Sequence, residues 1–195
     1  LPSECKSQLA IIAWPWSSPI DVEGAKAGIK AKISSFRRNS VNSTMGKAKA
    51  VANYLNSQMS KQEALDAGCD VAILLDDMGY VAEASGECLF IVRDGFLISP
   101  PNDNSLESIT QNAVIKLAKD LGLKVKRRNI TRDEIYICDE VFSTGTAAEI
   151  TPFLEVDSRI IGKGKTGKIT KKIQKAYFDL VYAKNEKYQN QLTFI

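Results

Sequence analysis

Short apolar runs alternate with amphipathic stretches along most of the chain. The run LAIIAWPW at 9–16 predicts a buried strand that Pro15 and Pro19 stop. Alternating apolar residues within 28–38 predict a half-buried strand, because successive side chains of a strand point to opposite faces. Further strands are predicted at 70–77, 80–85, 88–99, 124–130 and 141–145. The DG pair inside 88–99 indicates a hairpin turn.

Helical periodicity appears between these strands. The pattern predicts a helix over 46–68 that ends at Gly68, and another over 109–122 that Ser108 caps and Gly122 closes. Thr131 is the expected N-terminal cap of a third helix, and the pattern over 167–189 predicts an amphipathic helix. Because strands and helices alternate without a repeat or an internal linker, we expect residues 1–195 to form a single α/β or α+β domain with a mixed sheet.

Composition narrows the possible chemistry. The net charge of +3 is too small to indicate a nucleic-acid or anionic-membrane partner, and no apolar run approaches the length of a membrane span. Four cysteines without zinc-like spacing indicate reduced thiols in a cytoplasmic protein. Histidine is absent, which excludes a catalytic imidazole and any histidine-ligated metal. Proton transfer would therefore need lysine, carboxylate or tyrosine.

The stretch STGTAAEITP at 143–152 follows an apolar strand and is rich in small and hydroxyl residues. Small residues allow close approach of the backbone, and backbone N–H groups in such a turn can hold a phosphate or a carboxylate. The alternative is an ordinary junction between a strand and a helix, since small residues are common in turns.

Two glutamates, Glu83 and Glu87, lie in the otherwise apolar segment YVAEASGECLF. A buried carboxylate is costly without a partner, so each is expected to face a cation or a strong donor. The alternative is a pair of glutamates on an edge strand that point to water. A glycosidase pair is disfavoured, because those acids usually come from separate elements on either side of a sugar cleft.

Two lysine-containing segments suggest other chemistry. Lys49 and Tyr54 stand at the head of the predicted helix among small and apolar residues, where desolvation favours a neutral, nucleophilic amine. A solvated surface lysine is the alternative. The segment GKGKTGKI at 162–169 nearly matches a nucleotide-binding P-loop, but Ile169 replaces the hydroxyl that must reach magnesium, so a basic surface turn is favoured.

Four blocks occur in a compatible order: Lys49 with Asn53 and Tyr54, then GYVAEASGECLF, then LESIT at 106–110, then STGTAAEITP. From about residue 9 to about residue 180, the chain resembles the fold-type-IV pyridoxal-phosphate aminotransferases, and within them the branched-chain amino-acid aminotransferases. The resemblance implies a C-terminal cofactor-binding domain with a mixed sheet, or pseudo-barrel, flanked by helices. It implies pyridoxal 5'-phosphate as the cofactor and no metal.

The resemblance also implies roles around the cofactor ring. Lys49 would bind the cofactor as a Schiff base and move the substrate proton. Glu83 would accept a hydrogen bond from the ring nitrogen and keep it protonated. Tyr54 would contact the 3′ oxygen, with Glu87 supporting that network, and Leu106 would pack on the ring.

The remaining implied roles concern anions. Thr146 and the N–H groups of Ile109 and Thr110 would bind the cofactor phosphate, which agrees with the known preference of helix N-termini for anions. Thr146 and the backbone near Ala147 and Ala148 would bind the substrate's α-carboxylate.

The implied reaction exchanges the amino group of leucine, isoleucine or valine with 2-oxoglutarate, so the implied partners are amino acids and 2-oxo acids, in a homodimer or higher homo-oligomer. Three positions depart from the family pattern: Cys88, Gln111 and Lys168. The chain starts at Leu1 without an N-terminal domain, so we expect residues 1–8 to be a linker remnant and the chain alone to be nearly inactive. D-amino-acid transamination, aminodeoxychorismate lysis and a catalytically inactive folded fragment are the alternatives.

Overall fold

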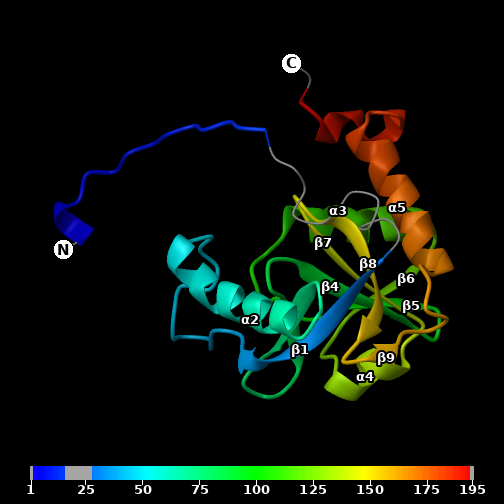
Figure 1. Ribbon diagram of the computed structural model, residues 1–195. Helices are drawn as coiled ribbons and strands as arrows, with labels where there is room; N and C mark the ends of the chain where they lie inside the picture. Colours follow the sequence, from blue (N-terminus) through cyan, green and yellow to red (C-terminus); the bar gives the residue numbers. More distant parts are fainter. Residues whose placement is uncertain (1, 16–27, 194–195) are drawn as a thin grey trace.

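The computed structural model describes residues 2–15 and 28–193. Within these ranges the strands form one mixed sheet in the order β3-β2-β1-β8-β7-β4-β5-β6, with β9 paired to β8 (Figure 1). The strands are β1 (Ile29–Arg37), β2 (Val71–Leu75), β3 (Val81–Ala84), β4 (Cys88–Arg93), β5 (Phe96–Ser99), β6 (Lys124–Arg127), β7 (Glu140–Gly145), β8 (Glu149–Val156) and β9 (Arg159–Ile160).

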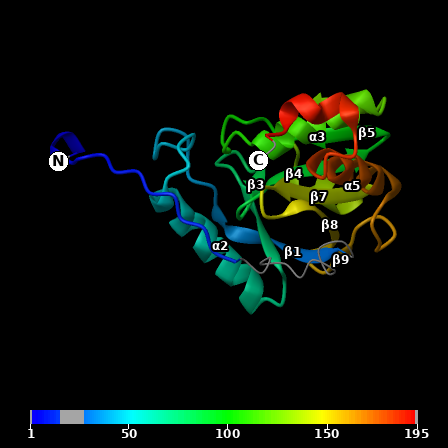
Figure 2. The same ribbon diagram turned by 90° about the horizontal axis from the view of Figure 1, so that it is seen from above.

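Helices cover separate parts of this sheet. Helix α2 packs on β1 and β2, whereas α3 and α5 pack on each other and on β7 (Figure 2). The helical elements are η1 (Pro2–Glu4), η2 (Val51–Asn53), α2 (Tyr54–Asp66), α3 (Ile109–Asp120), α4 (Arg132–Ile137), α5 (Lys168–Val181) and η3 (Glu186–Gln191). No helix in the described part of the chain is long and apolar enough to cross a membrane.

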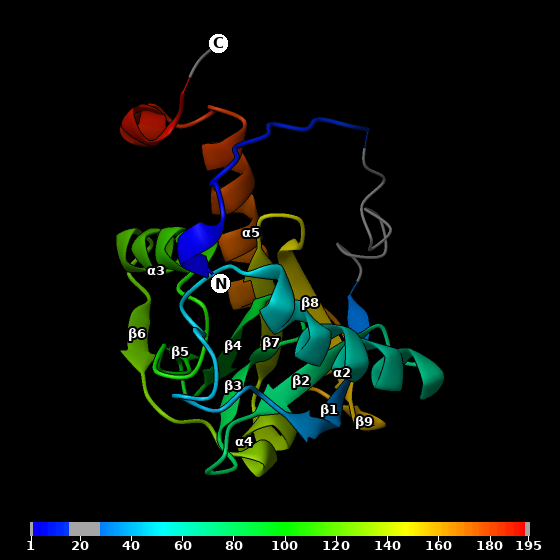
Figure 3. The same ribbon diagram turned by 90° about the vertical axis from the view of Figure 1, so that its left-hand side faces the viewer.

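Strand β1 lies inside the sheet, with a parallel neighbour on each side. Ala31 pairs with Val71 of β2 and with Val156 of β8. Parallel strands place their carboxyl ends at the same edge, so the chain leaves β1 and β2 side by side. The N–H of Arg38, just after β1, donates to the carbonyl of Leu75 at 2.8 Å. The return strand β3 pairs with β2 in antiparallel fashion beside this edge (Figure 3).

The sheet buries a separate apolar cluster on each face. Along β7, Val141 belongs to one cluster and Phe142 to the other, as the alternation of a strand requires. Phe142 stacks on Phe90 with ring centroids 5.1 Å apart, under α3 and α5. The second cluster also contains Leu117 and Ile173 from those helices. Helices α3 and α5 therefore cover the middle of the sheet on this face.

Most of the predicted elements are confirmed. The strand in 28–38, the strands in 70–77 and 80–85 and the paired strands in 88–99 are all present. Asp94 and Gly95 form the expected hairpin turn with φ values of 51° and 74°. The Ser108 side chain accepts a hydrogen bond from the N–H of Gln111 and caps α3.

Four expectations about the fold are wrong. The amphipathic helix expected over 167–189 ends at Val181, and a separate 3-10 helix, η3, follows at Glu186–Gln191. Leu9–Pro15 forms no strand, and Leu9 and Ile11 are more than nine-tenths exposed, because the run extends away from the sheet instead of packing on it (Figure 1). Its expected end at Trp16 and Pro19 lies outside the described residues. The helix expected from residue 46 begins only at η2, since Asn53 holds the preceding loop. Residues 149–156 form β8, so the alternative of a junction to a helix is wrong.

The start of α5 depends on one carboxylate. Glu140 accepts hydrogen bonds from the N–H groups of Ile169 at 3.0 Å and Thr170 at 2.7 Å, and from the Thr170 hydroxyl at 2.6 Å. We expect Glu140→Ala to lower the free energy of unfolding by about 1–3 kcal/mol, because these donors lose their acceptor. Urea unfolding measures the change. Glu186→Ala, at an exposed position, is the control, and an equally small loss in both variants would contradict the assignment.

Candidate functional site

A small cavity at the carboxyl end of β1 brings together side chains from three segments of the chain. Lys49 precedes η2 and Tyr54 begins α2, Glu83 comes from β3, and Leu106 comes from the loop before α3. Arg38, just after β1, forms part of the same wall. Four of the residues singled out in the sequence are therefore neighbours. The cavity volume is about 50 Å³, well below the several hundred Å³ of a typical small-molecule pocket, so these residues enclose only part of a site.

The Lys49 amine lies beside a phenol. Its Nζ is 2.7 Å from the Tyr54 hydroxyl, and 5.4 Å from the centre of the Tyr54 ring. Lys49 is exposed, so the expectation of a desolvated setting for its side chain is wrong for this structure. It precedes η2 rather than standing within a helix, which leaves its side chain open to solvent.

Asn53 fixes the loop that carries Lys49. Its buried side-chain amide donates to the carbonyl oxygens of Met45 at 3.1 Å and Ala48 at 3.0 Å. Two hydrogen bonds from a single amide restrain the backbone immediately before the lysine. The loop therefore presents Lys49 from a defined position although its side chain is exposed.

Glu83 is buried and paired with a cation. It is 8% exposed, and its Oε1 accepts a hydrogen bond from Arg38 Nε. Burial raises the pKa of the Glu83 carboxyl, and the charge and hydrogen bond of Arg38 oppose that rise. Strand β3 does lie at the edge of the sheet, but the interpretation that Glu83 points to water is wrong. The expectation that a buried glutamate here faces a cation is confirmed.

Arg38 is the residue that sequence reasoning missed. It follows directly on Arg37, and nothing in the pair RR distinguishes the exposed side chain from the buried one. The alternation of Ile29, Ala31 and Ile33 would place Arg37 on the buried face, but the register shifts after Ile33, so the buried arginine is Arg38. The pairing with Glu83 also depends on β3, which the sequence of β1 does not specify.

Glu87 lies apart from the cavity, beside the turn after β7. It is half-buried, and its Oε2 accepts a hydrogen bond from the N–H of Gly86 at 3.2 Å. Burial raises the pKa of its carboxyl, and that hydrogen bond opposes the rise. A Cβ built on Gly145 would lie 3.7 Å from Glu87 Cγ, so the glutamate packs against the start of the small-residue turn.

The small-residue turn is shorter than expected. Ser143 and Thr144 are buried in β7, and only 146–148 form the turn to β8. Thr146 and Ala147 are exposed, and Thr151 Oγ1 donates to the carbonyl of Ala148 at 2.7 Å. The turn therefore offers a hydroxyl and backbone N–H groups to solvent, but the hydroxyls of Ser143 and Thr144 are not available to it.

The beginning of α3 is a second place for an anion. Ser108 satisfies the N–H of Gln111, while the helix itself has no acceptor for the N–H groups of Ile109 and Thr110. Ile109 is exposed and Thr110 is buried. Leu106, on the loop before this helix, reaches the cavity of Lys49 and Glu83. The helix N-terminus and the cavity thus share one loop, although Ile109, Thr110 and the turn at 146–148 do not line the cavity.

No group of three or more histidine, cysteine, aspartate or glutamate residues that could hold a metal ion occurs among the described residues.

Comparison with known proteins gives concordant matches. A model of the family described as "Amino-transferase class IV" matches residues 2–156. A branched-chain-amino-acid aminotransferase of Pseudomonas aeruginosa is 47% identical over 193 residues, which are 99% of this chain and 63% of that protein. A probable branched-chain-amino-acid aminotransferase of Aquifex aeolicus is 52% identical over 168 residues, which are 85% of this chain and 54% of that protein.

Solved structures agree with these matches. The branched-chain aminotransferase of Thermoproteus uzoniensis with norvaline has a TM-score of 0.87 and 43% identity, over 93% of this chain and 59% of that one. The branched-chain amino acid aminotransferase of Thermobaculum terrenum, in its PLP form, has a TM-score of 0.83 and 42% identity, over 85% of this chain and 55% of that one. The expected fold class, a mixed sheet flanked by helices, is confirmed. The chain spans 63% and 54% of the length of the two curated relatives.

The Arg38–Glu83 pair gives a stability prediction. Arg38→Met leaves a buried carboxylate without its cation, and we expect it to lower the free energy of unfolding by about 3–5 kcal/mol. Adding Glu83→Met to this variant removes the unpaired charge and should restore much of the loss. Arg37→Met, at the exposed neighbouring position, is the matched control. Urea unfolding of the four proteins measures these changes, and a double variant no more stable than Arg38→Met would contradict the pair.

Proposed function

The chain belongs to the class IV amino-transferase family, and we propose that it is the cofactor-binding domain of a pyridoxal-phosphate-dependent branched-chain amino-acid aminotransferase. The observation that carries the proposal is the contact of the Lys49 amine with the Tyr54 hydroxyl, beside the buried carboxylate of Glu83. Amine, phenol and carboxylate are the groups that this cofactor needs around its ring.

The residues at the cavity fit pyridoxal 5'-phosphate. When bound, this cofactor acts as an electron sink for the bond that breaks at the α-carbon of an amino acid. The exposed Lys49 amine is accessible for covalent attachment, and Leu106 offers an apolar surface for a ring. The small volume of the cavity supports a site that is completed by further parts of the protein, which we propose to be a second domain.

Each polar group has a distinct proposed task. Lys49 Nζ holds the cofactor and later moves the proton taken from the substrate α-carbon. The Tyr54 hydroxyl, 2.7 Å from Nζ, orients the amine and contacts the cofactor's 3′ oxygen. Glu83 accepts a hydrogen bond from the ring nitrogen, and Arg38 supports the ionised form of Glu83 that this task requires. Glu87 supports this arrangement from the side of the small-residue turn.

Two backbone segments supply anion sites in this proposal. The N–H groups of Ile109 and Thr110 at the start of α3, together with the Thr146 hydroxyl, bind the cofactor phosphate. Thr146 and the backbone N–H groups near Ala147 and Ala148 bind the α-carboxylate of the substrate, in a turn where Thr146 and Ala147 are exposed. Thr146 thus serves both anions in this proposal.

The proposed substrates are leucine, isoleucine and valine with 2-oxoglutarate, and the products are the corresponding 2-oxo acids and glutamate. We propose a homodimer or higher homo-oligomer for the complete protein. Cys5, Cys69, Cys88 and Cys138 are all free thiols, which supports a reducing compartment such as the cytoplasm. Assays of the complete protein with branched-chain L-amino acids, D-amino acids and aminodeoxychorismate distinguish the proposed reaction from its sister activities.

Borohydride labelling tests Lys49. We expect reduction of the complete, cofactor-loaded protein to fix the cofactor on the peptide that contains AKAVANY, because Lys49 lies beside Tyr54 and Glu83. Peptide mass spectrometry locates the label. Lys49→Ala should abolish labelling, whereas Lys47→Ala should retain it. Label on another lysine would end the assignment.

Thr146→Ala tests the turn between β7 and β8. A hydrogen bond to a charged phosphate contributes about 1.5–3 kcal/mol, so we expect cofactor affinity to fall by about one to two powers of ten. Excess pyridoxal phosphate should largely restore turnover, because the reacting groups remain. Fluorescence titration of the apoprotein measures the affinity. Unchanged affinity would mean that the turn does not bind the phosphate.

A further inference from the structure

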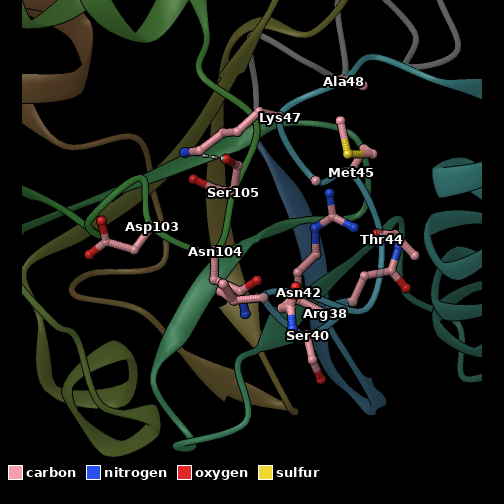
Figure 4. Close-up of a pocket in the computed structure, with 13 residues that line it drawn as sticks. Arg38, Ser40, Asn42, Thr44, Met45, Lys47, Ala48, Asp103, Asn104 and Ser105 are labelled. Carbon is pink, nitrogen blue, oxygen red and sulfur yellow. Dashed lines mark hydrogen bonds between the residues drawn. The ribbon is translucent and has the colours of Figure 1, made fainter.

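A second cavity lies on the other side of Arg38. Its volume is about 290 Å³, and it is formed by the loop that connects β1 to Lys49 and by the loop before Leu106 (Figure 4). Arg38, Gly46 and Ala48 line this cavity as well as the smaller one that contains Lys49 and Glu83. Arg38 therefore separates two adjacent spaces, of which the proposed function uses only one.

Arg38 divides its guanidinium between these spaces. Its Nε donates to Glu83, while Nη1 is buried and has no hydrogen-bond partner among the described residues. The side chain is 93% buried, since only 7% is exposed. A buried guanidinium N–H without an acceptor is costly, so native proteins almost always give such a group a partner. In the view of Figure 4, the guanidinium lies between the side chains of Met45 and Thr44, which line the second cavity.

Two cations line the cavity, and both are paired with carboxylates. Arg38 is paired with Glu83 and Lys47 with Glu107, while Asp103 is the carboxylate among the lining residues. Lys47 is already engaged, because its Nζ donates to the carbonyl of Ser105 at 3.3 Å and lies 3.7 Å from Glu107 Oε1. Arg38 is therefore the cation with a buried donor to offer.

Neutral donors complete the lining. Asn39, Asn42 and Asn104 carry side-chain amides, and Ser40 and Thr44 carry hydroxyls. Amide N–H and hydroxyl groups can share the second oxygen of a ligand whose first oxygen accepts from a guanidinium. The volume suits a ligand of a few heavy atoms rather than a nucleotide or a peptide.

We propose that this second cavity binds a small monocarboxylate, with one carboxylate oxygen on Arg38 Nη1 and the other on the neutral amide and hydroxyl donors. A guanidinium is the preferred partner of a carboxylate, because its planar N–H groups match the two oxygens. The site is separate from the proposed catalytic cavity and does not depend on the cofactor.

Binding here is coupled to Glu83 through the shared guanidinium. A carboxylate on Nη1 and the carboxylate of Glu83 compete for one positive charge, so each weakens the other's interaction with Arg38. By linkage, a change that removes the charge of Glu83 strengthens binding in the second cavity. This increase in affinity on removing the Glu83 charge distinguishes the site from an unrelated surface cation.

Titration of the ¹⁵N-labelled chain with acetate, which replaces chloride at constant ionic strength, tests the proposal. We expect a saturable shift of the Arg38 Nε–Hε resonance and of the backbone amides of Asn104 and Ser105. Glu83→Gln should bind acetate at least threefold more tightly, whereas Arg37→Met, at the exposed neighbour, should bind as the unchanged protein does. Shifts without saturation, or unaltered or weaker affinity in Glu83→Gln, would overturn the proposal.

The loss-of-function variant avoids an unpaired buried charge. Arg38→Met combined with Glu83→Met removes both members of the pair, and its fold is checked from the dispersion of its amide resonances. We expect the saturable shifts of Asn104 and Ser105 to disappear in this variant. Acetate affinity equal to that of the unchanged protein would place the binding elsewhere and would also overturn the proposal.

Discussion

The need to neutralise one buried carboxylate organises this end of the molecule. Glu83 lies on an edge strand but is almost fully covered, and the cation that pairs with it is Arg38, just after β1. Burial without that cation would favour the protonated acid. The placement of Arg38 in turn depends on the parallel pairing of β1 with β2, which brings the Arg38 N–H to the carbonyl of Leu75. The register of β1 against β2 therefore determines whether the buried Glu83 has a cation beside it.

The packed interior and the exposed reactive side chains lie in different parts of the fold. The aromatic pair Phe90 and Phe142 is fully buried under α3 and α5, whereas Lys49 and Thr146 are exposed on loops. Loops that carry reactive groups are held at their bases, as Asn53 holds the segment before Lys49 and Thr151 holds the turn at Ala148. This division allows reactive side chains to meet a ligand without disturbing the packed sheet.

Local patterns predicted local structure well, and failures occurred where a partner far along the chain decides the outcome. Alternation identified β1, and turn chemistry identified the Asp94–Gly95 hairpin, because both signals lie within a few residues. The apolar run at 9–15 has the composition of a strand but no sheet neighbour among the described residues. In the candidate site, the pairing requirement of Glu83 was predictable from its apolar flanks, but the identity of Arg38 depended on tertiary structure.

The order of strands has a consequence for how the chain assembles during synthesis. Strand β1 can pair with β2 soon after both leave the ribosome, and Glu83 follows Arg38 by only 45 positions. The other edge of β1 pairs with β8, where Val156 is the partner of Ala31. Until β8 has been synthesised, that edge of β1 is unpaired and can pair with other chains. Long-range parallel pairing of this kind is slow to form. The nascent protein thus acquires its charged pair early and closes its sheet late, so the interval between the two is when it most needs protection from aggregation.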